Sequence, residues 1–157
     1  MFVAFAPQWA AFYLPTTRQL ASAGLAAAAL ISSQAFLLLF AWLNRKHNAF
    51  WVLGLGLVLN LLVIILNGGL MPVSPETLLR MRPDRPLDSL QTGQRVGGSK
   101  DILLPEGQTK LAWLSDRFLL PTWFPTQAAF SLGDIFIAAG AFWLLWAAGG
   151  PKQNKAS

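Results

Sequence analysis

The sequence predicts an all-α integral membrane protein with three transmembrane helices, an N-terminal interfacial segment and a structured extramembrane loop. Three apolar runs carry this prediction. Residues 20–43 include no charged side chain, residues 49–66 include Asn60 as their only strongly polar one, and residues 128–150 include Asp134 as their only charge. Each run approaches the ~20 residues that a helix needs to cross the hydrocarbon core. The composition agrees, because 54% of the residues are hydrophobic and only 12% are charged.

Residues 1–19 are predicted to lie along the membrane interface. They are apolar and aromatic, but Pro7 and Pro15 interrupt them, so they are too short and too broken to span. Trp9 and Tyr13 favour the level of the lipid headgroups, because each side chain has an apolar ring and a polar tip. A degenerate additional span is the alternative that the sequence leaves open.

The predicted membrane helices occupy residues 20–43, 49–70 and 128–150. Small residues recur every four positions on the first and third helices, and this spacing predicts close approach of helix backbones. These residues are Gly24, Ala28 and Ser32 on the first helix, with Ala129 and Gly133 on the third. Gln34 and Asn60 are expected to hydrogen-bond across helices or to a partner, because an unpaired amide in lipid is unfavourable.

Residues 71–127 form the predicted extramembrane loop, and residues 151–157 form a polar tail. The loop holds six of the seven acidic residues and seven of the twelve basic ones. Because these charges nearly balance, the loop does not have the basic surface that nucleic-acid binding requires.

Charge and tryptophan placement predict the orientation. The turn at residues 45–47 and the tail at residues 152–155 are basic and contain no acid, so both are expected on the cytoplasmic side, with the loop outside. The raw count of Lys and Arg favours the opposite orientation, but the rule weakens for loops that approach ~60 residues. Four tryptophans fall near the predicted cytoplasmic side as interface anchors: Trp42, Trp51, Trp143 and Trp146.

The residue types exclude several kinds of site. The chain has no cysteine, which excludes disulfides, thiolate nucleophiles, Cys-ligated zinc and iron–sulfur centres. His47 is the single histidine, so no pair of imidazoles can hold a haem within the chain. The Gly-rich stretch at residues 92–100 lacks the spacing of a phosphate-binding loop. No cofactor or metal is therefore predicted, whereas a bound lipid or pigment stays open.

Two motifs sit where a long apolar run meets a polar loop. In the first, Gly68 and Gly69 allow positive φ after a helix end, and Asn67 can cap free carbonyls. In the second, Ser131 or Asp134 can accept from free amides at the start of the third helix or from the Asn67 turn. We therefore predict a structural latch that joins two helix ends. Its residues are Asn67, Gly68, Gly69, Met71, Pro72, Ser74, Glu76, Ser131, Gly133 and Asp134.

Three segments carry a resemblance to a known family: the Asn-Gly-Gly-x-Met-Pro-Val-Ser-Pro-Glu motif at residues 67–76, residues 114–121, and the Phe-Ser-Leu-Gly-Asp motif at residues 130–134. By these segments the chain resembles an uncharacterised bacterial inner-membrane family, a domain-of-unknown-function group. The sequence departs from the family in having Ser115 where Gly is usual and in its short N-terminus. The resemblance implies a membrane protein without an established activity.

Asp116 and Asp134 also distantly resemble the two catalytic aspartates of lipoprotein signal peptidase. Two carboxylates near a membrane surface could share a proton and activate water for peptide cleavage. However, Trp113 and Ser131 stand where that family has asparagines. The alternative uses are an ion pair of Asp116 with Arg117 and a backbone cap by Asp134.

The sequence therefore predicts a small non-catalytic accessory or scaffold subunit of a larger membrane complex. An energy-transducing complex, respiratory or photosynthetic, fits as the host, and the expected partners are the lipid bilayer and other membrane-protein subunits. The alternative is an intramembrane aspartyl peptidase that uses Asp116 and Asp134. A small transporter subunit is a weaker third interpretation, because only one span carries an ionisable residue.

Overall fold

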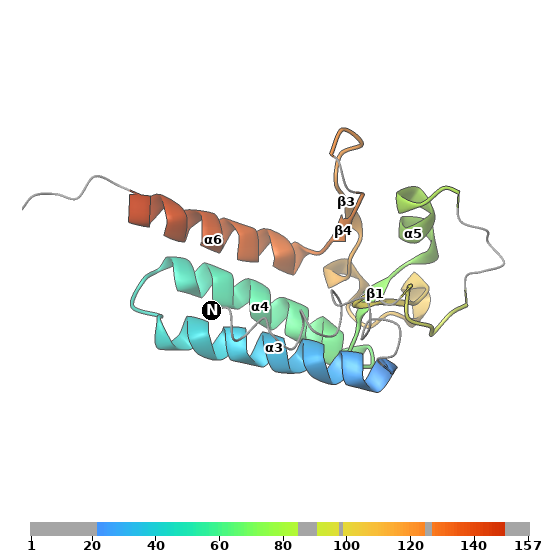
Figure 1. Ribbon diagram of the computed structural model, residues 1–157, viewed down its shortest axis with the longest axis horizontal. Helices are drawn as coiled ribbons and strands as arrows, with labels where there is room; N and C mark the ends of the chain where they lie inside the picture. Colours follow the sequence, from blue (N-terminus) through green and yellow to red (C-terminus); the bar gives the residue numbers. More distant parts are fainter. Residues whose placement is uncertain (1–21, 85–90, 98, 125–126, 150–157) are drawn as a thin grey trace, which may run out of the picture.

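The computed structural model describes residues 22–84, 91–97, 99–124 and 127–149. This part of the chain is mostly helical, and Figure 1 shows three long helices with α4 between α3 and α6. They are α3 (Ala23–Leu43), α4 (Ala49–Leu66) and α6 (Leu132–Gly149). Each is long and apolar enough to cross a membrane. The predicted interfacial segment, residues 1–19, and the polar tail, residues 151–157, lie outside the described residues.

The loop between α4 and α6 contains short strands, so the all-α prediction holds only for the long helices. β1 (Met71–Val73) pairs in parallel with β2 (Asp101–Leu103), and β3 (Phe118–Leu119) pairs antiparallel with β4 (Ala129–Phe130). The other loop elements are α5 (Pro75–Met81) and the 3₁₀ turns η2 (Glu106–Gln108) and η3 (Ala112–Leu114). Strands of two or three residues are too short to show the alternation that identifies a strand in a sequence.

The face of α3 that packs against α4 differs from the predicted one. Its buried residues are Ala26, Leu30, Ser33, Gln34, Leu37 and Ala41. The predicted small-residue stripe of Gly24, Ala28 and Ser32 is exposed instead. Two residues along an α-helix correspond to a rotation of about 200°. The stripe, which is offset by two residues from Ala26 and Leu30, therefore lies on the opposite side of α3.

Glycines set the close contact between α4 and α6. A Cβ atom added to Gly56 would lie 2.4 Å from the carbonyl oxygen of Gly133, and one added to Gly140 would lie 2.6 Å from the amide nitrogen of Leu53. Gly133, predicted as a packing residue, lies in this contact. Ala129, predicted with it, belongs to β4 and precedes the helix.

Two helix boundaries differ from the predicted ones, one because of a turn and the other because of strand pairing. α4 ends at Leu66 rather than residue 70, because the chain turns through Gly68 and Gly69 at φ of 84° and 89°. The amide of Gly69 then donates to the carbonyl of Ile64 at 2.8 Å. α6 begins at Leu132 rather than residue 128, because Ala129–Phe130 is paired with β3.

The main apolar core joins the helices to the loop. It combines residues of α3 and α4 with three residues that follow them along the chain. These residues are Ala26, Leu30, Val63, Ile64, Leu70, Met71 and Leu114. A second cluster of Val73, Leu78 and Leu103 holds α5 against β1 and β2. The loop is thus packed on the helix ends, and Figure 1 shows it at the opposite end of the helices from the α3–α4 turn.

Substitution of Gly140 tests the α4–α6 contact. Gly140→Ala should lower the free energy of unfolding by roughly 1–3 kcal/mol, because its methyl group would overlap the backbone of Leu53. Gly149→Ala is the matched control, since a Cβ atom there meets nothing within 4 Å. Thermal unfolding in detergent measures both, and equal midpoints for the two variants would contradict the close contact.

Candidate functional site

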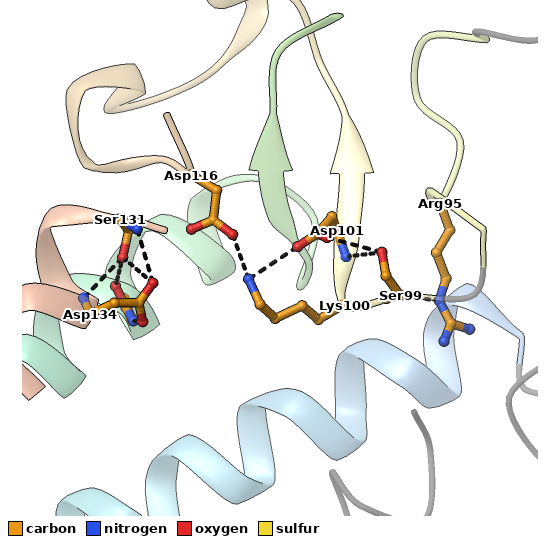
Figure 2. A network of polar contacts seen from close by, with 8 residues as sticks. Arg95, Ser99, Lys100, Asp101, Asp116, Ser131 and Asp134 are labelled. Atoms are coloured by element: carbon orange, nitrogen blue, oxygen red, sulfur yellow. Dashed lines mark hydrogen bonds and ion pairs between the residues drawn. The ribbon is translucent and has the colours of Figure 1, made fainter. Parts of the chain in front are cut away.

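Polar side chains from distant parts of the sequence meet where α6 begins and the loop covers the helix ends. We define the polar cluster as Asn60, Lys100, Asp101, Asp116, Ser131 and Asp134. Figure 2 shows Asp116 between Lys100 and the pair formed by Ser131 and Asp134. Both predicted catalytic carboxylates therefore belong to one cluster.

Ser131 and Asp134 cap the N-terminus of α6 reciprocally. The amide of Asp134 donates to Ser131 Oγ at 3.1 Å, and the amide of Ser131 donates to Asp134 Oδ2 at 2.9 Å. This arrangement satisfies two backbone amides that a helix start would otherwise leave free. The sequence prediction that these two residues accept backbone amides at this helix start matches the observed contacts.

Asn60 connects this cap to α4. Its Nδ2 donates to Asp134 Oδ1 at 2.8 Å, and its Oδ1 lies 2.8 Å from Ser131 Oγ. Ser131 Oγ also lies 2.9 Å from Asp134 Oδ2, so its one proton can serve either acceptor. Asn60 is 5% exposed, and without these contacts its amide would be buried without partners.

Lys100 forms the second half of the cluster. Its Nζ makes ion pairs with Asp116 Oδ2 and, at 3.0 Å, with Asp101 Oδ1. Asp116 is 2% exposed, and its Oδ1 has no hydrogen-bond partner. The backbone amide of Asp116 donates to the carbonyl of Pro72 at 3.2 Å, which places the carboxylate beside β1.

The predicted ion pair between Asp116 and Arg117 does not form. Arg117 lies 3.6 Å from Glu106 instead, and both side chains are exposed. The reason is geometric: the side chain of Asp116 is buried, whereas that of Arg117, the next residue, is exposed.

The polar cluster contains three carboxyl groups, those of Asp101, Asp116 and Asp134, and one ammonium group, that of Lys100. Burial raises the pKa of Asp116 to about 7; Lys100 acts in the opposite direction, while the charges of Asp101 and Asp134 add to the increase. Burial also lowers the pKa of Lys100, but the neighbouring Asp116 and Asp101 outweigh it and raise that pKa above its ordinary value. Lys100 is therefore charged at neutral pH, whereas the raised pKa of Asp116 lies close to neutral pH.

The first motif ties α4 to a different part of the loop. Asn67 Nδ2 donates to the carbonyls of Val63 and Lys110, at 2.8 and 2.9 Å, and the amide of Lys110 donates to Asn67 Oδ1 at 2.9 Å. Gly69 allows the turn to approach α3, since a Cβ atom there would lie 2.6 Å from Ala27 Cβ. The two motifs therefore bond to different segments: the Asn67 turn bonds to Lys110, and the α6 cap bonds to Asn60. These bonds do not join the two motifs to each other, as the predicted latch would.

The other predicted residues hold the segment that leaves this turn. Met71 and Pro72 are buried in β1, and Ser74 caps α5 by accepting from the amide of Thr77 at 3.1 Å. Glu76 is exposed in the first turn of α5. Gln34 is buried on α3, but its Oε1 has no hydrogen-bond partner, whereas Asn60 does bond across helices.

Sequence reasoning did not identify Lys100. The residue lies in a stretch rich in glycine and turn-forming residues, and nothing local distinguishes it from a solvated lysine. Its partner Asp116 is 16 residues away along the chain. The two come together because β2 pairs with β1 and the backbone of Asp116 also bridges to β1 at Val73. Among the residues that the structure describes, no group of three or more acidic or histidine side chains could hold a metal ion.

The raised pKa of Asp116 predicts a pH dependence of stability. The folded state holds this proton more tightly than the unfolded state does. The protonated carboxyl therefore adds to the free energy of unfolding below the ordinary pKa of 3.8, and this added stability is lost as the pH rises through about 7. Difference infrared spectroscopy should show a carboxylic-acid band disappearing near that pH, and Asp116→Asn should remove this step. A single step near 3.8 would contradict the burial effect.

One family match covers most of the chain. Residues 1–146 match the family of unknown function DUF5317. No curated protein and no solved structure matches the chain. The matched residues include α3, α4, the loop and all of the polar cluster. The chain therefore belongs to the DUF5317 family, a family of unknown function.

Proposed function

We propose that this protein is a small non-catalytic accessory or scaffold subunit of a larger bacterial membrane complex. The observation that carries the proposal is that both candidate catalytic carboxylates make contacts that join separate elements. Asp134 accepts hydrogen bonds at both oxygens, from Asn60 and from the backbone of Ser131. Asp116 is paired with Lys100. Both oxygens of Asp134 thus take part in contacts that hold α6 to α4 and cap the start of α6.

The surface of the helices supports a role in assembly. α4 packs against both α3 and α6, and Figure 1 shows the three helices as a layer rather than a closed bundle. The small-residue stripe of Gly24, Ala28 and Ser32 is exposed on the side of α3 that faces away from α4. Small residues allow close approach of another helix in lipid. We place the partner helix on this stripe, with lipid on the remaining apolar surface.

The proposed setting is the bacterial inner membrane, with the loop on the outer side and the α3–α4 turn on the cytoplasmic side. The turn contains Arg45 and Lys46 without an acid, which favours the cytoplasm. An energy-transducing complex, respiratory or photosynthetic, remains the proposed host.

Cysteine labelling tests this orientation, because the natural chain has no cysteine. A cysteine at the exposed loop position Gln91 should react with an impermeant thiol reagent in intact cells. A cysteine at the exposed turn position His47 should react only after the membrane is opened. The reverse pattern would overturn the proposed orientation.

A second candidate is an intramembrane aspartyl peptidase. Two observations favour it: Asp116 and Asp134 belong to one cluster, and Asp116 Oδ1 is buried without a partner. In this mechanism one carboxyl is protonated while the other takes a proton from the attacking water. The pKa of Asp116, raised to about 7 by burial, would suit such proton exchange.

Native mass spectrometry after mild detergent extraction separates the two candidates. An accessory subunit should co-purify with other membrane subunits. Ala28→Leu should reduce their recovery, because it places a large side chain on the small-residue stripe and so prevents close approach of a partner helix. Ala139→Leu, the same change at an exposed position of α6, is the matched control. A lone monomer from wild-type membranes would contradict the subunit proposal.

Carboxylate variants complete this experiment. Asp134→Asn should reduce assembly, because an amide cannot accept from both Asn60 and the Ser131 backbone as the carboxylate does. Asp84→Asn, at an exposed position after α5, is its control. Loss of a peptide-cleaving activity in Asp116→Asn, with assembly intact, would instead establish the peptidase.

A further inference from the structure

The end of the helices opposite the polar cluster contains a groove. It has a volume of about 920 Å³ and lies between α3, the start of α4 and the C-terminal half of α6. Its walls are apolar and include Phe40, Leu53 and Leu144, whereas Lys46 and His47 lie at its mouth in the α3–α4 turn. An apolar groove with a basic mouth matches a molecule that has an apolar chain and an anionic head.

We propose that this groove binds an anionic phospholipid, with an acyl chain along the apolar walls and the phosphate at Lys46. The proposal is independent of both candidate functions, because the groove shares no residue with the polar cluster.

Charge complementarity favours an anionic headgroup. Arg45, Lys46 and His47 occupy the turn, and the described acidic residues all lie between Glu76 and Asp134, in elements at the other end of the helices. Lys46 makes no ion pair with any residue that the structure describes. Its charge is thus available to a lipid phosphate. On the cytoplasmic side, where we propose that this turn lies, basic pockets between membrane helices bind such headgroups.

Arg45 differs from Lys46 in being held by the protein. Its guanidinium lies 4.3 Å from the ring centre of Trp42, and its Nη1 donates to the carbonyl of Trp42 at 3.0 Å. Arg45 also lines a separate pocket with Trp42 and Trp51, so it does not open into the groove. Lys46 is therefore the residue that we assign to the phosphate.

The aromatic residues at this end place the groove mouth at the level of lipid headgroups. Trp42, Trp51 and Trp146 are exposed at 56%, 57% and 73%, and Trp143 lines the groove. Exposed tryptophans gather at the interface between headgroups and acyl chains. A lipid in the groove would thus have its phosphate and chain at their usual depths, without displacement from the bilayer.

Native mass spectrometry of the full-length protein tests the proposal. The protein is equilibrated in nanodiscs with equal amounts of phosphatidylglycerol and phosphatidylcholine that have the same acyl chains. We expect about fivefold greater retention of phosphatidylglycerol, the effect of one basic side chain near an anionic lipid. Lys46→Gln should bring the ratio close to one. Arg82→Gln removes an exposed positive charge at the far end of the helices and should leave the ratio unchanged.

A second variant tests the groove rather than the charge. Ala148→Trp adds a large ring at an exposed position of the groove wall and should reduce the retention of both lipids. Equal retention of the two lipids by the wild-type protein would overturn the proposal, as would a ratio that Lys46→Gln leaves intact. Retention unaffected by Ala148→Trp, or a polypeptide found in place of lipid, would exclude the groove as the lipid site.

Discussion

The hydrogen bonds among Asn60, Ser131 and Asp134 determine how α6 sits on α4. They connect the middle of α4 to the start of α6, across more than 70 residues of sequence. Where water is scarce, each of these polar groups needs a protein partner. The glycines at 56 and 133 let the helices come close enough for the bonds to form. At the contact of α4 with α6, the close packing of the helices and the hydrogen bonding of these buried polar groups therefore depend on each other.

The ion pair of Lys100 with Asp116 extends the same constraint to the loop. Lys100 immediately precedes β2, and Asp116 follows η3, so their contact fixes two loop segments against each other. Burial raises the pKa of Asp116, and the pairing with Lys100 opposes this increase, while the charges of Asp101 and Asp134 act in the same direction as burial. A group that joins elements can thus also exchange a proton near neutral pH. This double property is why both a structural and a catalytic interpretation attach to the same residues.

Sequence patterns predicted some contacts of the candidate site and missed others for identifiable reasons. Local rules located the Ser131–Asp134 cap and the positive φ of Gly68 and Gly69, because caps and turns depend on a few adjacent residues. The spacing of small residues, by contrast, placed the packing face of α3 incorrectly. Small residues mark where backbones can approach, but Ala26 and Leu30 form the buried face because they meet Val63 and Ile64. The partner of a helix is a tertiary property, and residue size alone does not specify it.

The sequence by itself determined the three membrane-length helices and the polar residues at their ends, since hydrophobic length and turn chemistry are local properties. Only the tertiary structure decided that Asp116 pairs with Lys100 rather than Arg117, and that Asn67 holds Lys110. These choices follow from β1–β2 pairing and from the turn after α4, which bring distant segments together. The physical reason is that burial removes water as an alternative partner. Each buried polar or charged group then pairs with the nearest protein group in space, rather than with the nearest one in sequence.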